Sequence, residues 1–354
     1  MKKIREWLAN GRVGALVQSV MPAVLAVAMA VGQPGFNVLM ALLAVVGVEC
    51  AHLAMNLADD WFDFRVDMMG DRDRVIRKGF RAMTAKYEYL SSGKQNLKTT
   101  AQAIAQFCTV AVVCGCIIFS YRWKVGGFSG ADGAWWIVAI VAAAGFLGAF
   151  YSAPPLKLAY RGLGELVTGV IFGPLLMMGV YYASCGRIDP GIVWVSIPVG
   201  LLVLNILFTH SFIDMPGDAE SNKMTFARLL GSMPFARQLG SQKVCLAASY
   251  LFNLLPFAMT VGAVCLGYLH PVYLISLVVL PRALWLCRSL TDFTRGKIDV
   301  PEKPAPWLGA MTKDWEAVRK AGIDWFLMRW FTARNLLSGF CLALLAARLL
   351  ALVL

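Results

Sequence analysis

Residues 36–67 read FNVLMALLAVVGVECAHLAMNLADDWFDFRVD. Residues 36–57 are almost all apolar, and a helix of about 20 apolar residues is long enough to cross the hydrocarbon core of a bilayer, about 30 Å thick. Four acidic residues follow within the next ten positions: Asp59, Asp60, Asp63 and Asp67. The stretch therefore predicts a membrane-spanning helix that ends in an acidic cluster.

The rest of the chain repeats this apolar pattern. Hydrophobic residues make up 58% of the 354 residues, charged residues make up 15%, and the mean hydropathy is +0.64, which excludes an ordinary soluble domain. The apolar blocks cover 13–30, 36–57, 99–120, 134–152, 165–184, 191–213, 244–265, 268–287 and 332–353. These blocks predict an all-α polytopic membrane protein with about nine transmembrane helices around a central cavity. No cleavage site for a secretory signal closes the first block, so we expect it to remain a helix.

The basic residues are distributed unevenly along the chain. Of the 33 Lys and Arg residues, 29 fall in the N-terminal segment or in alternate loops, at 1–12, 57–98, 153–164, 214–243 and 282–334. The positive-inside rule then predicts an integral protein of the cell (inner) membrane, with the N-terminus and these loops in the cytoplasm. Basic loops beside an anionic leaflet account for the net charge of +12, so the expected partner is the lipid bilayer, and no nucleic acid is expected.

Domain organisation follows from the same pattern. No short-period repeat is visible, and we expect one domain over 1–354 with a cap of cytoplasmic loops at 57–98, 153–164, 214–243 and 282–331. The last of these loops ends in an amphipathic segment, Trp315–Trp330, which we expect at the membrane interface. The nine cysteines have neither CxxC spacing nor nearby histidines, which predicts buried small side chains rather than metal ligands.

The first acidic cluster has the spacing of a helical stripe. Asn56, Asp60, Asp63 and Asp67 stand at i, i+4, i+7 and i+11 and so share one face of a helix. Carboxylates arranged in this way repel one another, which indicates that they meet a cation. Ligands that offer only oxygen suit Mg²⁺, which takes one or two carboxylates and completes its shell with water and phosphate.

A second cluster closes the apolar block 191–213. His210, Asp214 and Asp218 again share a stripe. The loop assignment places both clusters at the cytoplasmic ends of their helices, where they can converge across one cavity as a cradle for a diphosphate. Acidic residues often mark the end of a single membrane helix, but a pair of clusters on one face favours function. Cations available to the remaining phosphate oxygens are Arg72, Arg74, Arg77, Lys78 and Lys223.

These paired motifs resemble the two signatures of the UbiA superfamily of intramembrane prenyltransferases. The resemblance covers nearly the whole chain. It implies that Mg²⁺ is held by catalytic carboxylates, namely Asp60, Asp63, Asp67, Asp214 and Asp218. It also implies a reaction in which an allylic polyprenyl diphosphate ionises and an electron-rich aromatic carbon captures the prenyl cation. Fixed cations would stabilise the leaving group, and a dry cavity would shield the carbocation from water.

A third segment, 151–166, with Phe172–Leu175, resembles the branch of that family that prenylates 1,4-dihydroxy-2-naphthoate in menaquinone biosynthesis, with loss of the carboxylate. The phrase Asp60–Phe64 and the turn at Lys223–Thr225 fit the same branch. Asp59, His210, Asn222 and Ala153–Pro154 depart from its usual pattern. The residues expected to bind substrate are Asn56, Arg72, Arg74, Lys78, Tyr151, Lys157, Tyr160, Arg161, His210 and Lys223.

Several alternatives stay open at this point. The turn at Pro154–Pro155 and the pair Gly173–Pro174 can also be purely architectural, and His52 can be a hydrogen-bond partner or an acceptor-site residue. The acceptor can instead be 4-hydroxybenzoate, homogentisate, haem, or a glycerol or ribose phosphate. A transporter of ions or solutes is the alternative from another class, but it predicts charges near the bilayer midplane, whereas these aspartates stand at helix ends.

Overall fold

The computed structural model describes residues 2–67, 87–130, 132–220, 223–312 and 314–354, with only the backbone described for residues 2–4, 66 and 67. Helices and turns make up this described part of the chain, which contains no strand. Eight helical runs within it are long and apolar enough to cross a membrane, at Val38–Arg65, Leu97–Gly126, Trp135–Ser152, Gly164–Cys185, Pro190–Ile213, Ser241–Cys265, Pro271–Thr294 and Asp324–Ala351. The predicted all-α polytopic membrane protein is confirmed.

The first apolar block forms a shorter helix than the others. Helix α1 (Lys2–Asn10) is followed by a 3₁₀ turn, η1 (Val13–Ala15), and then by the apolar helix α2 (Val17–Ala30). Arg12 separates α1 from η1 because its backbone is in the left-handed region, with φ 60° and ψ 53°, a conformation that no α-helix continues through.

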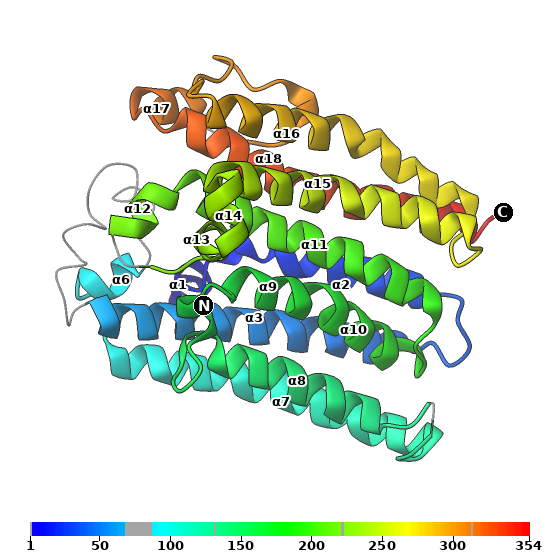
Figure 1. The fold of residues 1–354 in the computed structure, drawn as a ribbon. Coiled ribbons are helices and arrows are strands. Elements are labelled where there is room, and N and C mark those ends of the chain that lie inside the picture. Colours follow the sequence, from blue (N-terminus) through cyan, green and yellow to red (C-terminus); the bar gives the residue numbers. More distant parts are fainter. Residues whose placement is uncertain (1, 68–86, 131, 221–222, 313) are drawn as a thin grey trace. The chain divides into compact units, whose positions relative to one another are not determined.

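Contacts between Cα atoms divide the chain into two compact units, so the expected single domain remains a prediction. The first unit comprises Met1–Lys157 and Leu175–Val193. In it, α3 packs against both α7 and α8, and α10 contacts α2, α3 and α8 (Figure 1). Its remaining helices are α3 (Val38–Asp67), α6 (Glu88–Ser91), α7 (Leu97–Gly126), α8 (Trp135–Ser152) and α10 (Leu176–Cys185).

The second unit comprises Leu158–Pro174 and Trp194–Leu354. Within it, α15 contacts α13, α14 and α16, and α18 contacts α16 (Figure 1). Its elements, of which η3 and α11 have their end residues Leu175 and 190–193 in the first unit, are η2 (Leu158–Arg161), α9 (Gly164–Val170), the π-helical turn η3 (Ile171–Leu175), α11 (Pro190–Ile213), α12 (Met215–Glu220), α13 (Phe226–Ser232), α14 (Pro234–Leu239), α15 (Ser241–Cys265), η4 (Pro271–Val279), α16 (Leu280–Thr294), η5 (Pro306–Leu308), α17 (Trp315–Lys320) and α18 (Asp324–Ala351).

The close approach of η3 to α11 in the second unit explains two glycines. A Cβ atom on Gly173 would lie 2.4 Å from Gly200 Cα, and one on Gly200 would lie 2.6 Å from Gly169 O. Such distances are far inside van der Waals contact, so glycine is required where these backbones meet. The Gly173–Pro174 pair therefore has an architectural role: it widens a helical turn and does not break the helix.

The segment 282–331 is more helical than its charges suggest. Helix α16 continues to Thr294, and α18 already begins at Asp324. Both extensions bury apolar side chains, among them Leu286, Leu290 and Phe326. Arg329 in α18 is buried with them and donates hydrogen bonds to the carbonyl oxygens of Ser289 and Trp325. The amphipathic segment Trp315–Trp330 is divided between α17 and α18 at Gly322, whose φ of 68° ends a helix.

Candidate active site

The first of the two predicted acidic stripes lies on one unbroken helix of the first unit. Helix α3 runs to Asp67, so Asn56, Asp60 and Asp63 share a face near its C-terminal end. Asp60 is only 1% exposed, whereas Asp63 is half-buried. A buried carboxylate needs partners of opposite charge or hydrogen-bond donors to remain ionised.

Arg12 supplies the positive charge at this stripe. Its Nη2 atom lies 3.2 Å from Asp60 Oδ1 and 3.7 Å from Asp59 Oδ2, and it also donates a hydrogen bond of 3.1 Å to the carbonyl oxygen of Asn56. The Asn56 side chain in turn donates to the carbonyl oxygen of Gly11 at 2.9 Å. The turn before η1 is thus fastened to α3 at the acidic stripe.

Two hydroxyl groups among the described residues also contact these carboxylates. Tyr89 donates a hydrogen bond to Asp60 Oδ2 at 3.3 Å, and Ser152, at the end of α8, donates to Asp59 Oδ1 at 2.8 Å. These donors come from two elements distant in sequence from α3. They orient Asp59 and Asp60 in different directions, although the two residues are adjacent in the chain.

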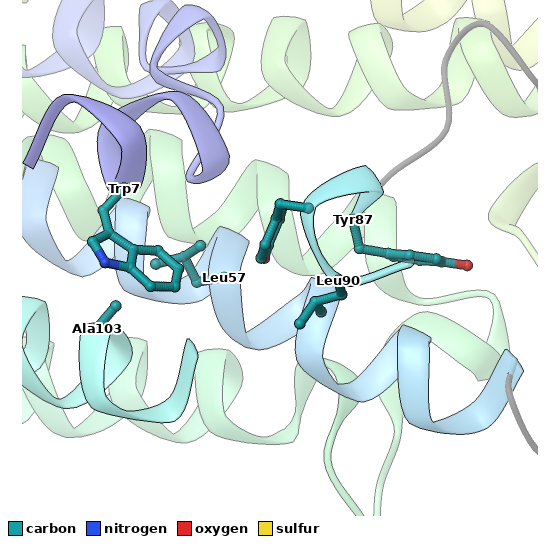
Figure 2. Packing of buried hydrophobic residues seen from close by; sticks show 6 residues of the cluster. Trp7, Leu57, Tyr87, Leu90 and Ala103 are labelled. Atoms are coloured by element: carbon teal, nitrogen blue, oxygen red, sulfur yellow. The ribbon is translucent and has the colours of Figure 1, made fainter. Parts of the chain in front are cut away.

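A buried hydrophobic cluster fixes the position of Tyr89. Figure 2 shows Trp7, Leu57, Tyr87, Leu90 and Ala103 packed together, and Tyr89 belongs to the same cluster. The ring of Trp7 meets the ring of Tyr89 edge to face, with centroids 6.2 Å apart. Burial of these rings stabilises the arrangement by the hydrophobic effect. The cluster therefore joins α1, α3, α6 and α7 beside Asp60 of the first acidic motif.

The charges of the motif shift the pKa values of its neighbours. Burial alone would lower the pKa of Arg12, but the carboxylates of Asp60, Asp59 and Asp63 raise it above the ordinary value. The pKa of Tyr89 is raised by burial and by the nearby Asp60 carboxylate. Arg12 is therefore charged and Tyr89 is a neutral hydroxyl donor at physiological pH.

The second motif also forms a continuous stripe, although α11 ends within it. The amide of Asp214 donates to the carbonyl oxygen of His210 at 3.0 Å, and the amide of Asp218 donates to that of Asp214 at 2.9 Å. Helical hydrogen bonding thus carries on from α11 into α12, and the three side chains share a face as predicted. Asp214 and Asp218 are 5% and 3% exposed, and His210 lies edge-on to the rings of Phe326 and Trp330 in α18.

Glu165 and Arg228, which the sequence did not single out, form hydrogen bonds with groups around this motif. Glu165 Oε1 accepts a hydrogen bond of 2.6 Å from Ser211 Oγ and one of 3.1 Å from the amide of Phe226. Arg228 Nη1 donates to the carbonyl oxygens of Asp218, at 3.1 Å, and Lys223, at 2.5 Å. The end of α11, the segment around Lys223 and the start of α13 are therefore joined through buried or half-buried polar contacts.

The substrate-binding residues predicted in the third segment are only partly tested by the structure. Tyr151 and Tyr160 are half-buried, and Lys157 and Arg161 are exposed. Tyr151 and Lys157 belong to the first unit and Tyr160 and Arg161 to the second, so their grouping remains a prediction. Arg72, Arg74, Arg77 and Lys78 lie outside the described residues, as do Asn222 and the side chain of Asp67.

The donor sets of both motifs suit a hard divalent cation. Within the described residues, no three His, Cys, Asp or Glu side chains converge as a ready-made metal site. Mg²⁺, however, commonly takes only one or two protein carboxylates and leaves its other positions to water and phosphate. Asp60 already accommodates the positive charge of Arg12 at 3.2 Å. The carboxylates of each motif therefore fit Mg²⁺ that is shared with a phosphorylated ligand.

Arg12, Tyr89, Ser152, Glu165 and Arg228 were missed because each stands outside the two motifs in the sequence. Their partners lie between 5 and 93 positions away along the chain, at Lys223 for Arg228 and at Asp59 for Ser152. The basic character of residue 12 was counted only toward topology. A signal was present in that Arg12 immediately precedes the first apolar block, as a residue beside a membrane-end site would.

Comparison with known proteins gives a consistent result. The model of the UbiA prenyltransferase family matches residues 19–300. A 2-carboxy-1,4-naphthoquinone phytyltransferase of Synechocystis sp. is 28% identical over 198 residues, which cover 56% of this chain and 55% of the relative. A 1,4-dihydroxy-2-naphthoate octaprenyltransferase of Bacillus subtilis is 22% identical over 61% of this chain and 63% of the relative. The enzyme of the same name from Escherichia coli is 26% identical over 72% of this chain and 79% of the relative.

The chain thus spans 55% and 63% of the lengths of the Synechocystis and Bacillus relatives.

Solved structures resemble it over almost their whole length. A structure concerned with digeranylgeranylglyceryl phosphate synthase matches with a TM-score of 0.58 and 14% identity, covering 98% of this chain and 99% of that one. A UbiA homolog from Archaeoglobus fulgidus bound to GPP and Mg²⁺ matches with a TM-score of 0.54 and 13% identity over 96% and 99%. At such identities the likeness concerns the fold.

Proposed function

Because the chain belongs to the UbiA prenyltransferase family, we propose that it transfers a polyprenyl group from an allylic diphosphate to an aromatic acceptor. The acceptor in this proposal is 1,4-dihydroxy-2-naphthoate, which makes the product a menaquinone precursor. The observation that carries the proposal is the pair of carboxylate stripes, with the buried Asp60 and the half-buried Asp63 in α3 and the buried Asp214 and Asp218 where α11 passes into α12. The names of the naphthoate-type relatives support the choice of acceptor.

Magnesium is the cofactor in this proposal. Asp60, Asp63 and Asp67 would hold it in the first motif, and Asp214 and Asp218 in the second. When bound, Mg²⁺ supplies positive charge to the oxygens of the departing diphosphate. A structural relative with GPP and Mg²⁺ bound supports this cofactor.

The residues around the motifs orient the carboxylates and offset their negative charge. Arg12 offsets the mutual repulsion of Asp59 and Asp60, and Tyr89 and Ser152 orient one carboxylate each. Glu165 and Arg228 hold the second motif in place through Ser211 and the backbone. Preorganised groups of this kind reduce the reorganisation needed when charge develops on a leaving group.

Substrate binding is assigned to the remaining polar residues. Lys223 and the loop cations Arg72, Arg74 and Lys78 bind the diphosphate oxygens in this proposal, and Asn56 and His210 flank them. Tyr151, Lys157, Tyr160 and Arg161 bind the anionic aromatic acceptor. The positive charges of the lysine and arginine side chains match the negative charges of the diphosphate and the acceptor.

The proposed orientation places the acidic motifs at the cytoplasmic face of the cell (inner) membrane. The basic residues gathered beside the motifs support it, since the positive-inside rule assigns such loops to the cytoplasm. The bilayer would then hold the polyprenyl chain of the donor while the diphosphate stays at the membrane surface.

An acceptor screen tests the proposal. Purified protein in detergent or lipid is incubated with Mg²⁺, a polyprenyl diphosphate and one acceptor at a time, and prenylated products are identified by mass spectrometry. We expect product with 1,4-dihydroxy-2-naphthoate. Product with 4-hydroxybenzoate or homogentisate alone would retain the prenyltransferase and overturn the acceptor, and absence of product with every acceptor, from protein shown to be folded, would overturn the function.

A further inference from the structure

A second polar cluster lies in the first unit, deeper along α3 than the acidic motif. Ser19 in α2 is fully buried, and its Oγ atom lies 2.8 Å from Glu49 Oε2 and 2.7 Å from His52 Nδ1. His52 is 5% exposed. Glu49 and His52 both lie in the apolar part of α3, where ionisable side chains are costly and usually have a function.

The contacts around Ser19 allow a shared proton chain. A serine hydroxyl has one proton to donate and can accept two hydrogen bonds. Its Oγ atom has three partners, because it also lies 3.1 Å from the carbonyl oxygen of Leu16. When Ser19 donates to Glu49 or to His52, it can accept from the other. The chain can run from the His52 Nδ1–H through Ser19 to an ionised Glu49, or from a protonated Glu49 through Ser19 to His52. A proton that reaches Glu49 can thus be passed to His52 by reversing the chain.

One carboxylate oxygen of the cluster can still accept a hydrogen bond from a ligand. Glu49 Oε1 is buried and has no hydrogen-bond partner among the described residues, and a buried carboxylate oxygen without a donor is unfavourable. Glu49, His52, Asn56 and Asp60 stand at i, i+3, i+7 and i+11 and so share the stripe of the first motif. With a rise of about 1.5 Å per residue, His52 lies about 12 Å along the helix from Asp60.

We propose that Glu49, coupled through Ser19 to His52, accepts the proton of a hydroxyl group of the aromatic acceptor during prenyl transfer. This inference rests on the proposed function and adds the group that takes the hydroxyl proton of the acceptor. The ligand class is a ring with a free hydroxyl group, which donates its O–H to Glu49 Oε1. Glu49 is the catalytic residue in this account, and Ser19 and His52 are positioning residues.

The proton balances over the reaction. As the ring carbon bonds to the prenyl group, the allylic C–O bond breaks, diphosphate leaves, and the hydroxyl proton moves to Glu49, so that the ring oxygen becomes a carbonyl. When the carboxylate on the attacked carbon leaves as CO₂, its bonding electrons restore the aromatic ring as an oxyanion. That oxyanion takes the proton back from Glu49. Glu49 therefore takes up one proton, returns it, and ends in its starting state.

The experiment combines a variant with a modified acceptor. Wild-type protein and Glu49→Gln are compared with 1,4-dihydroxy-2-naphthoate and with each of its two monomethyl ethers, one of which lacks the proton in question. Ser19→Ala breaks the chain between Glu49 and His52. Ser184→Ala is the matched control, because Ser184 is equally buried in the first unit but donates only to the carbonyl oxygen of Val180 within its own helix.

We expect Glu49→Gln to lower kcat with the dihydroxy acceptor by about 100-fold, a usual effect of losing a general base. One monomethyl ether should slow the wild-type protein by a similar factor and should slow Glu49→Gln by less than about threefold further, since the variant and the ether remove the same transfer. Ser19→Ala should raise KM for the acceptor and lower kcat, and Ser184→Ala should change neither. Binding of the polyprenyl diphosphate with Mg²⁺, measured by calorimetry, should be unchanged in all variants.

If Glu49→Gln lowers the rate with the dihydroxy acceptor and with both ethers by the same factor, the inference is overturned. The cluster is then a structural link between α2 and α3. Unchanged kcat in Glu49→Gln would overturn it as well. Both results presuppose product from the wild-type protein. Absence of product from the wild type with every acceptor would instead overturn the proposed function.

Discussion

Arg12 Nη2 lies 3.2 Å from Asp60 Oδ1, and the Asp60 side chain is 1% exposed. A residue from the turn before η1 and α2 thus neutralises the most deeply buried carboxylate among the described side chains of the first motif. The same guanidinium reaches Asp59 Oδ2 at 3.7 Å. Because carboxylates held this close repel one another unless a cation lies between them, Arg12 maintains the geometry that Mg²⁺ and diphosphate are proposed to use.

Replacing Arg12 with Gln should lower the free energy of unfolding by about 2 kcal/mol, because it leaves the buried Asp60 without its cation while the partly exposed arginine itself is replaced at little cost. Mg²⁺ can supply part of the missing charge, so it should raise the Tm of Arg12→Gln more than that of the wild type. Thermal unfolding in detergent with and without Mg²⁺ measures this. Arg5→Gln, at an exposed position of α1, is the control, and equal Mg²⁺ shifts in all three proteins would refute the role of Arg12.

Tyr89→Phe should raise the Mg²⁺ concentration that gives half-maximal activity by about threefold or more, since loss of a group that orients a metal-binding carboxylate weakens metal affinity. The substitution keeps the ring and its packing on Trp7 and removes only the donor to Asp60. Mg²⁺ titrations of product formation measure the effect. Tyr121→Phe, which removes a hydroxyl that accepts from Asn37, should leave the titration unchanged. An unchanged titration for Tyr89→Phe would show that Asp60 needs no such orientation.

Glu165 offers a test of hydrogen bonding against charge. Both of its hydrogen bonds, from Ser211 and from the Phe226 amide, end on the same oxygen, so Glu165→Gln can keep them and Glu165→Ala cannot. We expect Glu165→Ala to lose about 2–4 kcal/mol of stability and more than about tenfold in activity, because the end of α11 loosens. Glu165→Gln should stay within about threefold of the wild type. Equal losses in the two variants would mean that the negative charge, rather than the hydrogen bonds, is what matters.

Much of the fold could be predicted from the sequence because membrane helices have to be apolar over a fixed length. The blocks 99–120, 191–213 and 244–265 fall inside α7, α11 and α15, which begin one to three residues earlier, and α7 also ends six residues later. The prediction was least accurate where a helix continues with charged residues on one face, as α16 does to Thr294. Apolar content does not report such an extension, because only one side of the helix needs to be buried.

The acidic stripes could also be predicted, since helical periodicity relates Asp60 to Asp63 and Asp214 to Asp218 within a few residues. Their supporting contacts could not. Tyr89 and Ser152 reach Asp60 and Asp59 across 29 and 93 positions of the chain, and only tertiary packing brings them together. The Ser19–Glu49–His52 cluster was hidden for the same reason, because Ser19 and Glu49 lie on different helices.

In the proposed function, both acidic motifs serve one magnesium-dependent prenyl transfer. The most direct measurement is the release of diphosphate together with prenylated naphthol by purified wild-type protein, Asp60→Asn, Asp214→Asn and, as a control, Asp299→Asn in an exposed loop. We predict that the wild type and Asp299→Asn form both products in equal amounts, that EDTA abolishes them, and that Asp60→Asn and Asp214→Asn each lose at least about 100-fold in rate. Full activity in Asp60→Asn or Asp214→Asn, or product formation that continues in EDTA, would contradict the account.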